Sequence, residues 1–272
     1  MSLRSLMHAE IPGARIVRFL FWGVLAVLLL FWSFRLAMAV QRDRFLPVFH
    51  IQDDHLVPEY ESIFQYVDRI AGRHHVLLTF DDGPYGKGVD EEILRVLRKH
   101  RAKAIFFVVC GHIHEATRPV LREMRDEGHW IGNHSDSHPD LTRLDGAMLD
   151  GQIEGCSRQL EKEVGYRPPF FRPPFGRHAP AVDKAVSAAG MQLVLWDANS
   201  QDSWRKDPAD ILHWSRTEAR EGSILLMHST PWTAGALDRT LTALEDIGVD
   251  FVSVAGPRPA PERRPPQARG VG

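Results

Sequence analysis

Cysteine is scarce in this sequence, with two residues among 272. Two cysteines cannot form the disulfide framework of a small secreted scaffold, and no Cys-x-x-Cys pair is available to bind zinc. Cys110 ends a strand-like run, and Cys156 lies on the apolar stripe of a helical segment. Both are therefore predicted first as buried small hydrophobic residues, with a Cys110–Cys156 disulfide as the alternative for an exported domain.

An excess of charge of either sign is also lacking, because 33 Lys and Arg residues face 35 Asp and Glu residues, for a formal net charge of -2. Without a basic field, nucleic acid is a poor candidate for the main partner. A neutral or glycan substrate fits this balance better.

Long apolar runs are lacking except for one near the start, Phe19–Val40, which only Arg35 interrupts. At about 1.5 Å per residue, a helix of this length can cross a bilayer core. We expect a transmembrane anchor behind a basic leader at 1–18. The alternative is a signal peptide cleaved after Ala39, which would leave a secreted domain. Basic residues flank the two ends in nearly equal numbers, so charge does not set the orientation.

The rest of the chain divides by composition. Residues 41–74 form a mixed linker, and residues 256–272, rich in Pro and Arg with almost no apolar side chains, are predicted to be a disordered tail. Between them, residues 75–255 have the length and composition of one globular domain.

Within this domain, short β-like runs alternate with segments of helical periodicity, which is typical of a parallel sheet with helical crossovers. The seven predicted strands are Val76–Phe80, Ala104–Val109, Trp130–Asn133, Phe170–Arg172, Gln192–Trp196, Ser223–Met227 and Phe251–Val254. The predicted helices are Glu91–His100, Pro119–Glu127, Gly146–Val164, Ala181–Ala189, Pro208–Glu221 and Leu237–Ile247. We expect an α/β fold in which the parallel strands close into a barrel.

Polar residues follow five of these strands, at the end where parallel barrels carry their reactive groups. They are Asp81 and Asp82 after the first strand, His134 and His138 after the third, Arg172 after the fourth, Asp197 and Asp202 after the fifth, and His228 after the sixth. Any one of them alone is more typical of a cap or a turn. Five together on one face predict an active site.

Two of these groups indicate metal chemistry. Asp81 and Asp82 are adjacent at a strand end and must point different ways, so one can bind a metal while the other acts as a base. An Asp-Gly turn is the simpler interpretation of that segment alone. His134 and His138 are spaced to lie on one side of a helical turn. With one carboxylate, they form a zinc-type site that leaves positions for water and substrate.

These residues are similar to the motifs of the NodB-like polysaccharide deacetylases, carbohydrate esterase family 4, over roughly residues 75–255. The matching runs are Thr79–Pro84 (Thr-Phe-Asp-Asp-Gly-Pro), His134–His138 (His-Ser-Asp-Ser-His), Arg172–Gly176 (Arg-Pro-Pro-Phe-Gly) and Leu226–His228 (Leu-Met-His). The resemblance implies a distorted, incomplete (β/α) barrel with fewer than eight strands. The seven strands counted above agree with that fold.

The resemblance also implies roles for the residues. Asp81 is the base, Arg172 orients it, and His228 is the acid. The ligands of one divalent ion, expected to be zinc with cobalt or manganese as alternatives, are Asp82, His134 and His138.

Two positions depart from the family pattern. The family has Asp directly followed by Trp in its fourth motif, whereas this chain has Asp202-Ser203-Trp204. Asp202 is expected to pair with His228, and Asp197 is a rival for that place. Ser229 stands where an aspartate is common, and the sequence offers no account of its effect.

The expected activity is metal-dependent hydrolysis of N-acetyl groups on an amino-sugar glycan, with release of acetate. Tyr85 and Trp204 are candidate substrate contacts, although an aromatic residue beside a strand is more often part of the core. The other expected partner is the membrane, bound through Phe19–Val40, with the catalytic domain periplasmic or extracellular. Two alternatives stand beside this one: a deacylase or deformylase of a lipid-linked sugar, and an inactive glycan-binding protein on the same fold. A binding protein has no need of both an acid and a base.

Overall fold

The computed structural model describes residues 49–52, 55–58 and 74–254. The anchor expected at Phe19–Val40, most of the linker, and the tail at 256–272 lie outside these residues. Within them, no helix combines the length and the apolar composition needed to span a bilayer. Strands β1 (Phe49–Gln52) and β2 (His55–Pro58) form an antiparallel pair inside the segment predicted as a linker.

A parallel sheet forms the centre of the domain. Its strands are β3 (His74–Gly83), β4 (Ala104–Val108), β5 (Trp130–Asn133), β6 (Phe170–Phe171), β7 (Gln192–Leu193), β8 (Ala198–Asn199), β9 (Ser223–His228) and β10 (Val249–Phe251). They run in the order β7-β6-β5-β4-β3-β9-β8, and all of their pairings are parallel. β10 pairs with the first residues of β3, on the edge that β4 occupies further along.

The two outermost strands of this order, β7 and β8, follow each other in the chain. The Val194 N–H donates to the Phe171 carbonyl on β6 at 2.8 Å, and the Asp197 N–H donates to the Ile224 carbonyl on β9 at 3.4 Å. Residues 194–197 therefore pass from one edge of the curled sheet to the other without a helix. The sheet is an incomplete parallel barrel, which confirms the predicted fold class.

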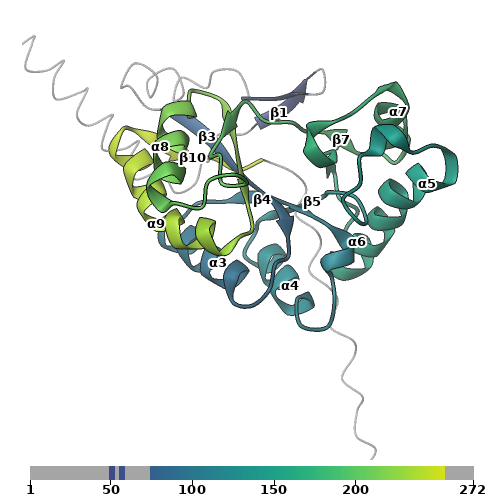
Figure 1. Ribbon diagram of the computed structural model, residues 1–272, viewed down its shortest axis with the longest axis horizontal. Helices are drawn as coiled ribbons and strands as arrows, with labels where there is room; N and C mark the ends of the chain where they lie inside the picture. Colours follow the sequence, from purple (N-terminus) through teal and green to yellow (C-terminus); the bar gives the residue numbers. More distant parts are fainter. Residues whose placement is uncertain (1–48, 53–54, 59–73, 255–272) are drawn as a thin grey trace, which may run out of the picture. The chain divides into compact units, whose positions relative to one another are not determined.

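Helices cover the outer face of this sheet. They are α3 (Val89–Lys99), α4 (Arg118–Asp126), α5 (Gly146–Asp150), α6 (Cys156–Val164), α7 (Pro180–Ala188), α8 (Pro208–Glu218) and α9 (Pro231–Asp246). Figure 1 shows α8 and α9 at the left, α3 and α4 below, and α5, α6 and α7 at the right, with the strands between them.

The alternation of β3 decides which of its side chains face the helices. Val76, Leu78 and Phe80 belong to the core cluster that packs against the helices. Leu77 belongs instead to the inner cluster, which lies inside the curled sheet. Because side chains alternate along a strand, Asp81 falls on the same inner face as Leu77.

The structure differs from the predicted elements in a few places. β8 was not predicted, because two residues are too few to show a period. The fifth predicted strand ends at Leu193 instead of Trp196. α9 begins at Pro231, six residues before the predicted start, where the Thr230 side chain caps the helix. The long predicted helix from Gly146 is divided into α5, a π-helical turn (Gly151–Gly155) and α6.

The cysteines correct our first interpretation. Cys110 and Cys156 are both buried, as predicted, but they are joined by a disulfide rather than packed as free thiols. The bond links a single 3-10 turn after β4, η2 (Cys110–His112), to the start of α6. Their helical and strand patterns could not show this pairing, because it depends on a distance between elements 46 residues apart.

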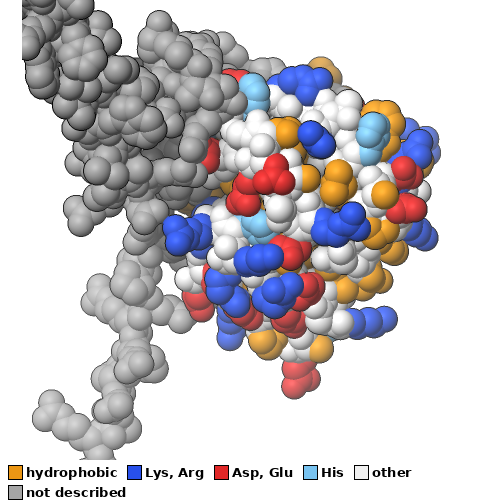
Figure 2. All heavy atoms as spheres, turned by 90° about the vertical axis from the view of Figure 1, so that its left-hand side faces the viewer, with side chains coloured by type: hydrophobic (Ala, Val, Ile, Leu, Met, Phe, Trp, Pro, Cys, Tyr) orange, Lys and Arg blue, Asp and Glu red, His pale blue; other side chains and the backbone are white. Residues whose placement is uncertain are grey.

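The surface does not gather charge of one sign on the side of α8 and α9. Figure 2 shows Lys and Arg interspersed there with Asp and Glu. Exposed ion pairs join α3 to its neighbours, Lys99 to Asp238 of α9 and Arg98 to Glu123 of α4. Positive charge is therefore not segregated from negative charge on this face.

Candidate active site

The candidate residues meet at one end of the barrel. Asp81 and His228 are register partners at the carboxyl ends of β3 and β9. β4 pairs with the other edge of β3, and β5 pairs with β4. His134 directly follows the carboxyl end of β5. The N–H of Arg172 then bonds the Asn133 carbonyl at that same end. Parallel strands with matched ends thus bring side chains from distant sequence positions together.

Arg172 is fully buried, and each nitrogen of its guanidinium donates at least one hydrogen bond. Nη1 donates to Asp81 Oδ1 at 2.7 Å and to Thr79 Oγ1 at 2.8 Å. Nε and Nη2 donate to the carbonyls of Val194 and Leu195 at 3.1 and 3.0 Å. The bridge between the two sheet edges therefore supplies carbonyls that aim Arg172 at Asp81.

Two opposing effects act on the Asp81 carboxyl. Burial raises its pKa, and the charge and hydrogen bond of Arg172 oppose that rise. Burial also lowers the pKa of Arg172. Because a guanidinium loses its proton only far above neutral pH, Arg172 stays charged and favours an ionised Asp81. Asp81 is thus a buried carboxylate whose direction is fixed by Arg172.

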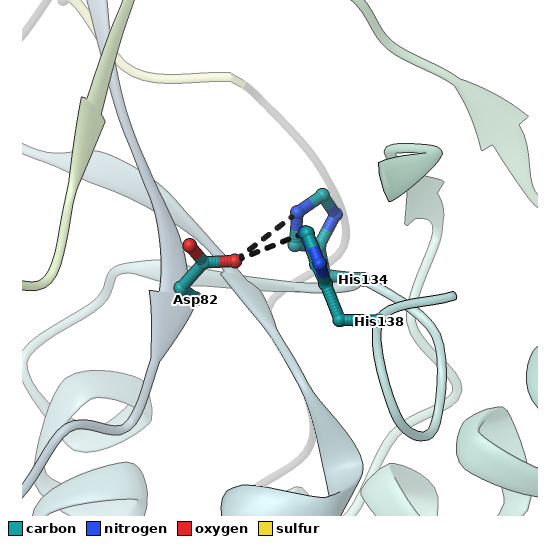
Figure 3. Close-up of side chains that lie close together, drawn as sticks. All are labelled: Asp82, His134 and His138. Atoms are coloured by element: carbon teal, nitrogen blue, oxygen red, sulfur yellow. Dashed lines mark ion pairs between the residues drawn. The ribbon is translucent and has the colours of Figure 1, made fainter. Parts of the chain in front are cut away.

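The backbone changes direction between Asp81 and Asp82, and both carboxylates approach the same ring nitrogen. Asp81 Oδ2 and Asp82 Oδ1 lie 3.6 and 3.5 Å from Nε2 of His134. The pairing of β3 with β4 passes from Asp81 to Gly83, so Asp82 is the extra residue of a bulge. Its φ is 68°, in the left-handed region that Asp tolerates better than most residues. Figure 3 shows its carboxylate facing His134 and His138, with Oδ1 at 3.5 and 3.3 Å from their Nε2 atoms.

His134 is held in one tautomer. Its Nδ1 lies 2.7 Å from the Arg172 carbonyl, which can only accept, so Nδ1 carries the hydrogen and Nε2 is left as a lone-pair donor. Burial is the main reason that the pKa of His134 falls to about 3, which keeps the ring neutral. His138 is placed by a local bond, because its N–H donates to Ser135 Oγ at 2.9 Å.

These three side chains fit a divalent metal ion. One ligand atom from each lies within 4.8 Å of the others, and no other such group occurs in the part of the chain that the structure describes. Asp82 Oδ1 is buried and has no hydrogen-bond partner among the described residues, as expected of an oxygen reserved for a cation. Two imidazoles and one carboxylate are a donor set suited to zinc or a similar ion.

His228 occupies the opposite kind of environment. Its Nδ1 donates to Asp202 Oδ1 and its backbone N–H donates to Asp202 Oδ2, both at 2.7 Å. Burial alone would lower the pKa of His228. The hydrogen bond and charge of Asp202, with smaller contributions from Asp81 and Asp82, outweigh burial and raise it to about 9. The ring is therefore charged at neutral pH.

Asp202, not Asp197, is the partner of this histidine. Asp202 is fully buried and also accepts from Thr233 Oγ1 at 2.7 Å. Asp197 instead accepts from the Ile224 N–H at 2.7 Å, within the sheet. Thr233 was missed in the sequence, and its place near the start of α9 became evident only when the early start of that helix was known.

The two aromatic residues predicted to contact substrate, Tyr85 and Trp204, are exposed and do not line a closed pocket. Tyr85 is 43% exposed, and its N–H donates to the buried Asp90 at 2.8 Å. Trp204 is 80% exposed and lies in the turn that includes Asp202. The extra residue between them, Ser203, belongs to the same turn. Phe175, also exposed, stacks edge-on to His138 with ring centroids 4.7 Å apart. Phe175 thus contacts His138, one of the three residues of the candidate metal site.

Comparisons with known proteins agree with this geometry. A family model described as polysaccharide deacetylase matches residues 68–194. The peptidoglycan-N-acetylglucosamine deacetylase of Bacillus cereus is 32% identical over 204 residues, covering 70% of this chain and 73% of that protein. A family 4 carbohydrate esterase from Streptomyces lividans, solved in complex with acetate, superimposes with a TM-score of 0.62 at 29% identity, covering 67% of this chain and 93% of that one.

A third relative is longer. The peptidoglycan-N-acetylglucosamine deacetylase PgdA of Listeria monocytogenes is 34% identical over 190 residues, which are 69% of this chain but 40% of PgdA. By its fold, its motifs and its relatives, this chain belongs to the polysaccharide deacetylases, carbohydrate esterase family 4.

Proposed function

We propose that this protein hydrolyses N-acetyl groups of a glycan with the help of one divalent metal ion, releasing acetate and leaving a free amine. The observation that carries this proposal is the convergence of three units at one barrel end. They are a buried carboxylate aimed by an arginine, a donor set for a metal, and a histidine whose pKa is raised to about 9. Amide hydrolysis needs all three: a base, an electrophile and an acid.

Asp82, His134 and His138 would hold the ion. When bound, it supplies Lewis acidity toward a carbonyl oxygen and lowers the pKa of a water toward about 7. The chain contributes the fixed tautomer of His134 and the orientation of Asp82, so the ligands need little rearrangement. The ligand types, two imidazoles and one carboxylate, favour zinc.

Asp81 would remove the proton from the attacking water. Burial makes its carboxylate a stronger base than an exposed one, while Arg172 keeps it ionised and fixes its direction. The water oxygen then forms the new bond to the acetyl carbon. Asp81 carries the proton that the water has lost.

His228 would protonate the leaving nitrogen. As the bond between the acetyl carbon and nitrogen breaks, the amine takes a proton from the charged imidazole, and Asp202 holds the ring by its other nitrogen. The product carries both oxygens, one from the amide and one from water, and it leaves as acetate once the remaining water proton passes to solvent. Transfer of the proton from Asp81 to solvent and reprotonation of His228 restore the starting state.

We propose peptidoglycan as the substrate class. The support is the similarity to the B. cereus and L. monocytogenes relatives, which are peptidoglycan-N-acetylglucosamine deacetylases. The test is a release assay in which acetate and formate are measured separately from peptidoglycan, chitin oligomers and lipid-linked sugars. Acetate from peptidoglycan supports the proposal. Formate or acetate from lipid-linked sugars alone would support the lipid-linked alternative, and no release from any of them would favour a binding protein.

We also propose that the reaction takes place outside the cytoplasm. Phe19–Val40 is the segment of the sequence able to anchor or export the domain, and a peptidoglycan substrate lies on that side. A pair of reporters fused after Gly272, one active only in the cytoplasm and one only outside it, decides the location. Activity of the cytoplasmic reporter alone would overturn this proposal.

A further inference from the structure

The carbonyl of Asp82 needs a partner that the sheet does not provide. The β3–β4 pairing passes over Asp82, and the φ of 68° turns its backbone out of the strand direction. A bulged residue is left unpaired by the ladder, so another group must satisfy it or water will.

His112 supplies that partner. Its Nδ1 lies 2.8 Å from the Asp82 carbonyl oxygen. Because a carbonyl only accepts, Nδ1 carries the hydrogen and donates it. His112 is itself exposed, at the end of η2, so its ring is not a packing element of the core.

The same turn also binds the loop of the metal-facing histidines. The Cys110 N–H donates to the Ser135 carbonyl at 3.1 Å, and the Gly111 N–H donates to the Asp136 carbonyl at 2.7 Å. A Cβ at Gly111 would lie 3.0 Å from the Asp136 oxygen, so this approach favours glycine. η2 thus contacts both the Asp82 bulge and the segment between His134 and His138.

We propose that His112 is a positioning residue of the metal site. Its hydrogen bond holds the Asp82 backbone in the bulged, left-handed conformation, and that conformation directs the carboxylate toward His134 and His138. The proposal deepens the function proposed above and rests on it for the identity of the site as a metal centre. Partners of this kind, one step removed from the ion, typically change metal affinity or activity by about 10 to 100-fold when removed.

The experiment uses the full chain and two substitutions of one residue. His112→Ala removes the donor, whereas His112→Asn places an amide N–H near the position of Nδ1. His114→Ala is the matched control, because His114 is also exposed on the same segment and its backbone, rather than its ring, bonds Thr117. Co²⁺ is titrated into each metal-free protein against a competing chelator, its visible spectrum is recorded, and acetate release is measured separately.

We expect His112→Ala to bind Co²⁺ about tenfold more weakly than the parent, with an altered spectrum and an unchanged thermal unfolding midpoint of the metal-free form. His112→Asn should recover most of the affinity and the spectrum, and His114→Ala should match the parent. Equal Co²⁺ affinity of parent and His112→Ala would overturn the inference. So would a loss that His112→Asn does not recover. If the parent binds Co²⁺ but releases no acetate, the proposed function fails, while the affinity comparison still decides the role of His112.

Discussion

His134 and His228 are the same side chain on the same face of one barrel, but their environments act on them in opposite directions. Burial is the largest influence on both rings and by itself lowers both pKa values. His134 faces a backbone carbonyl and its pKa falls to about 3, whereas His228 faces the buried carboxylate of Asp202 and its pKa rises to about 9. One ring is kept neutral, as the proposed ligand must be, and the other is kept charged, as the proposed acid must be.

The contrast shows what decides the role of a buried histidine. Desolvation disfavours the charged form wherever the ring is buried, and a buried carboxylate in direct contact can reverse that preference. A carbonyl fixes the tautomer without reversing it. The same barrel end can therefore hold one histidine that stays neutral and one that stays charged at neutral pH.

Removing the proposed metal ligands should have the largest effect on bound metal and on acetate release. Asp82→Ala combined with His134→Ala should reduce bound metal from about one equivalent to none and abolish measurable acetate release, because several kcal/mol of charge stabilisation are lost with the ion. Metal analysis of the purified protein and the release assay measure the two effects. His178→Ala with Asp183→Ala removes an exposed histidine and carboxylate pair elsewhere and should leave both unchanged. Full metal occupancy in the first double variant would show that the ligands are assigned wrongly.

Removing the proton carriers should have the next largest effect and spare the metal. Asp81→Asn and His228→Ala should each keep about one ion and lose at least about a hundredfold in turnover of an N-acetyl substrate. His228→Ala should affect an activated acetyl ester much less, since that leaving group needs little protonation. Equal losses on ester and amide would contradict the role of His228 as acid and would point to a part in shaping the site.

The effect of the Asp202 carboxylate on the pKa of His228 can be tested without removing the imidazole. Asp202→Asn keeps an acceptor for Nδ1 but removes the charge that offsets burial, so the pKa of His228 should fall from about 9 to below its ordinary value near 6.5. Activity that needs the imidazolium is present below this pKa and is lost as the pH rises through it. The alkaline limb of kcat/KM should therefore move to lower pH, with at least about a tenfold loss at pH 7.5.

The matched control for this shift is Asp197→Asn, which changes a carboxylate that bonds the Ile224 backbone instead of His228. Its alkaline limb should stay where it is in the parent. An alkaline limb that does not move in Asp202→Asn would mean that it reports another group.

The sequence was sufficient to predict which polar residues meet at the barrel end. Asp81, Asp82 and the His134–His138 pair were predicted from strand ends and intervals, because matched parallel strands bring their ends together whatever the details of the loops. The barrel class followed from the alternation of short apolar runs with helical periodicity. These signals are local in the chain.

Other features depend on contacts that no local pattern records. Asp202 and Asp197 could not be separated, since β8 between them has only two residues and the direction of each carboxylate is set by its turn. The bond from His112 to the Asp82 carbonyl joins residues 30 apart and requires the bulge, which a regular strand pattern does not show. The disulfide depends in the same way on the approach of η2 to α6.

Removing that disulfide should affect the surroundings of His134 but not those of His228, and it should change turnover least of the variants considered. Cys110 carries the turn that bonds the His134–His138 loop, whereas His228 and Asp202 belong to β9 and the segment after β8. Replacing both cysteines by alanine should lower the free energy of unfolding by about 2–4 kcal/mol, because the bond closes a long loop in the unfolded chain. It should also weaken Co²⁺ binding a few-fold by loosening η2, and leave the alkaline limb of kcat/KM in place. Denaturant unfolding, Co²⁺ titration and the pH profile measure these three quantities, with dithiothreitol-treated parent as a comparison. If the alkaline limb moved while the Co²⁺ affinity did not, the tether would act on the acid side of the site, and the division between the two histidine environments would be wrong.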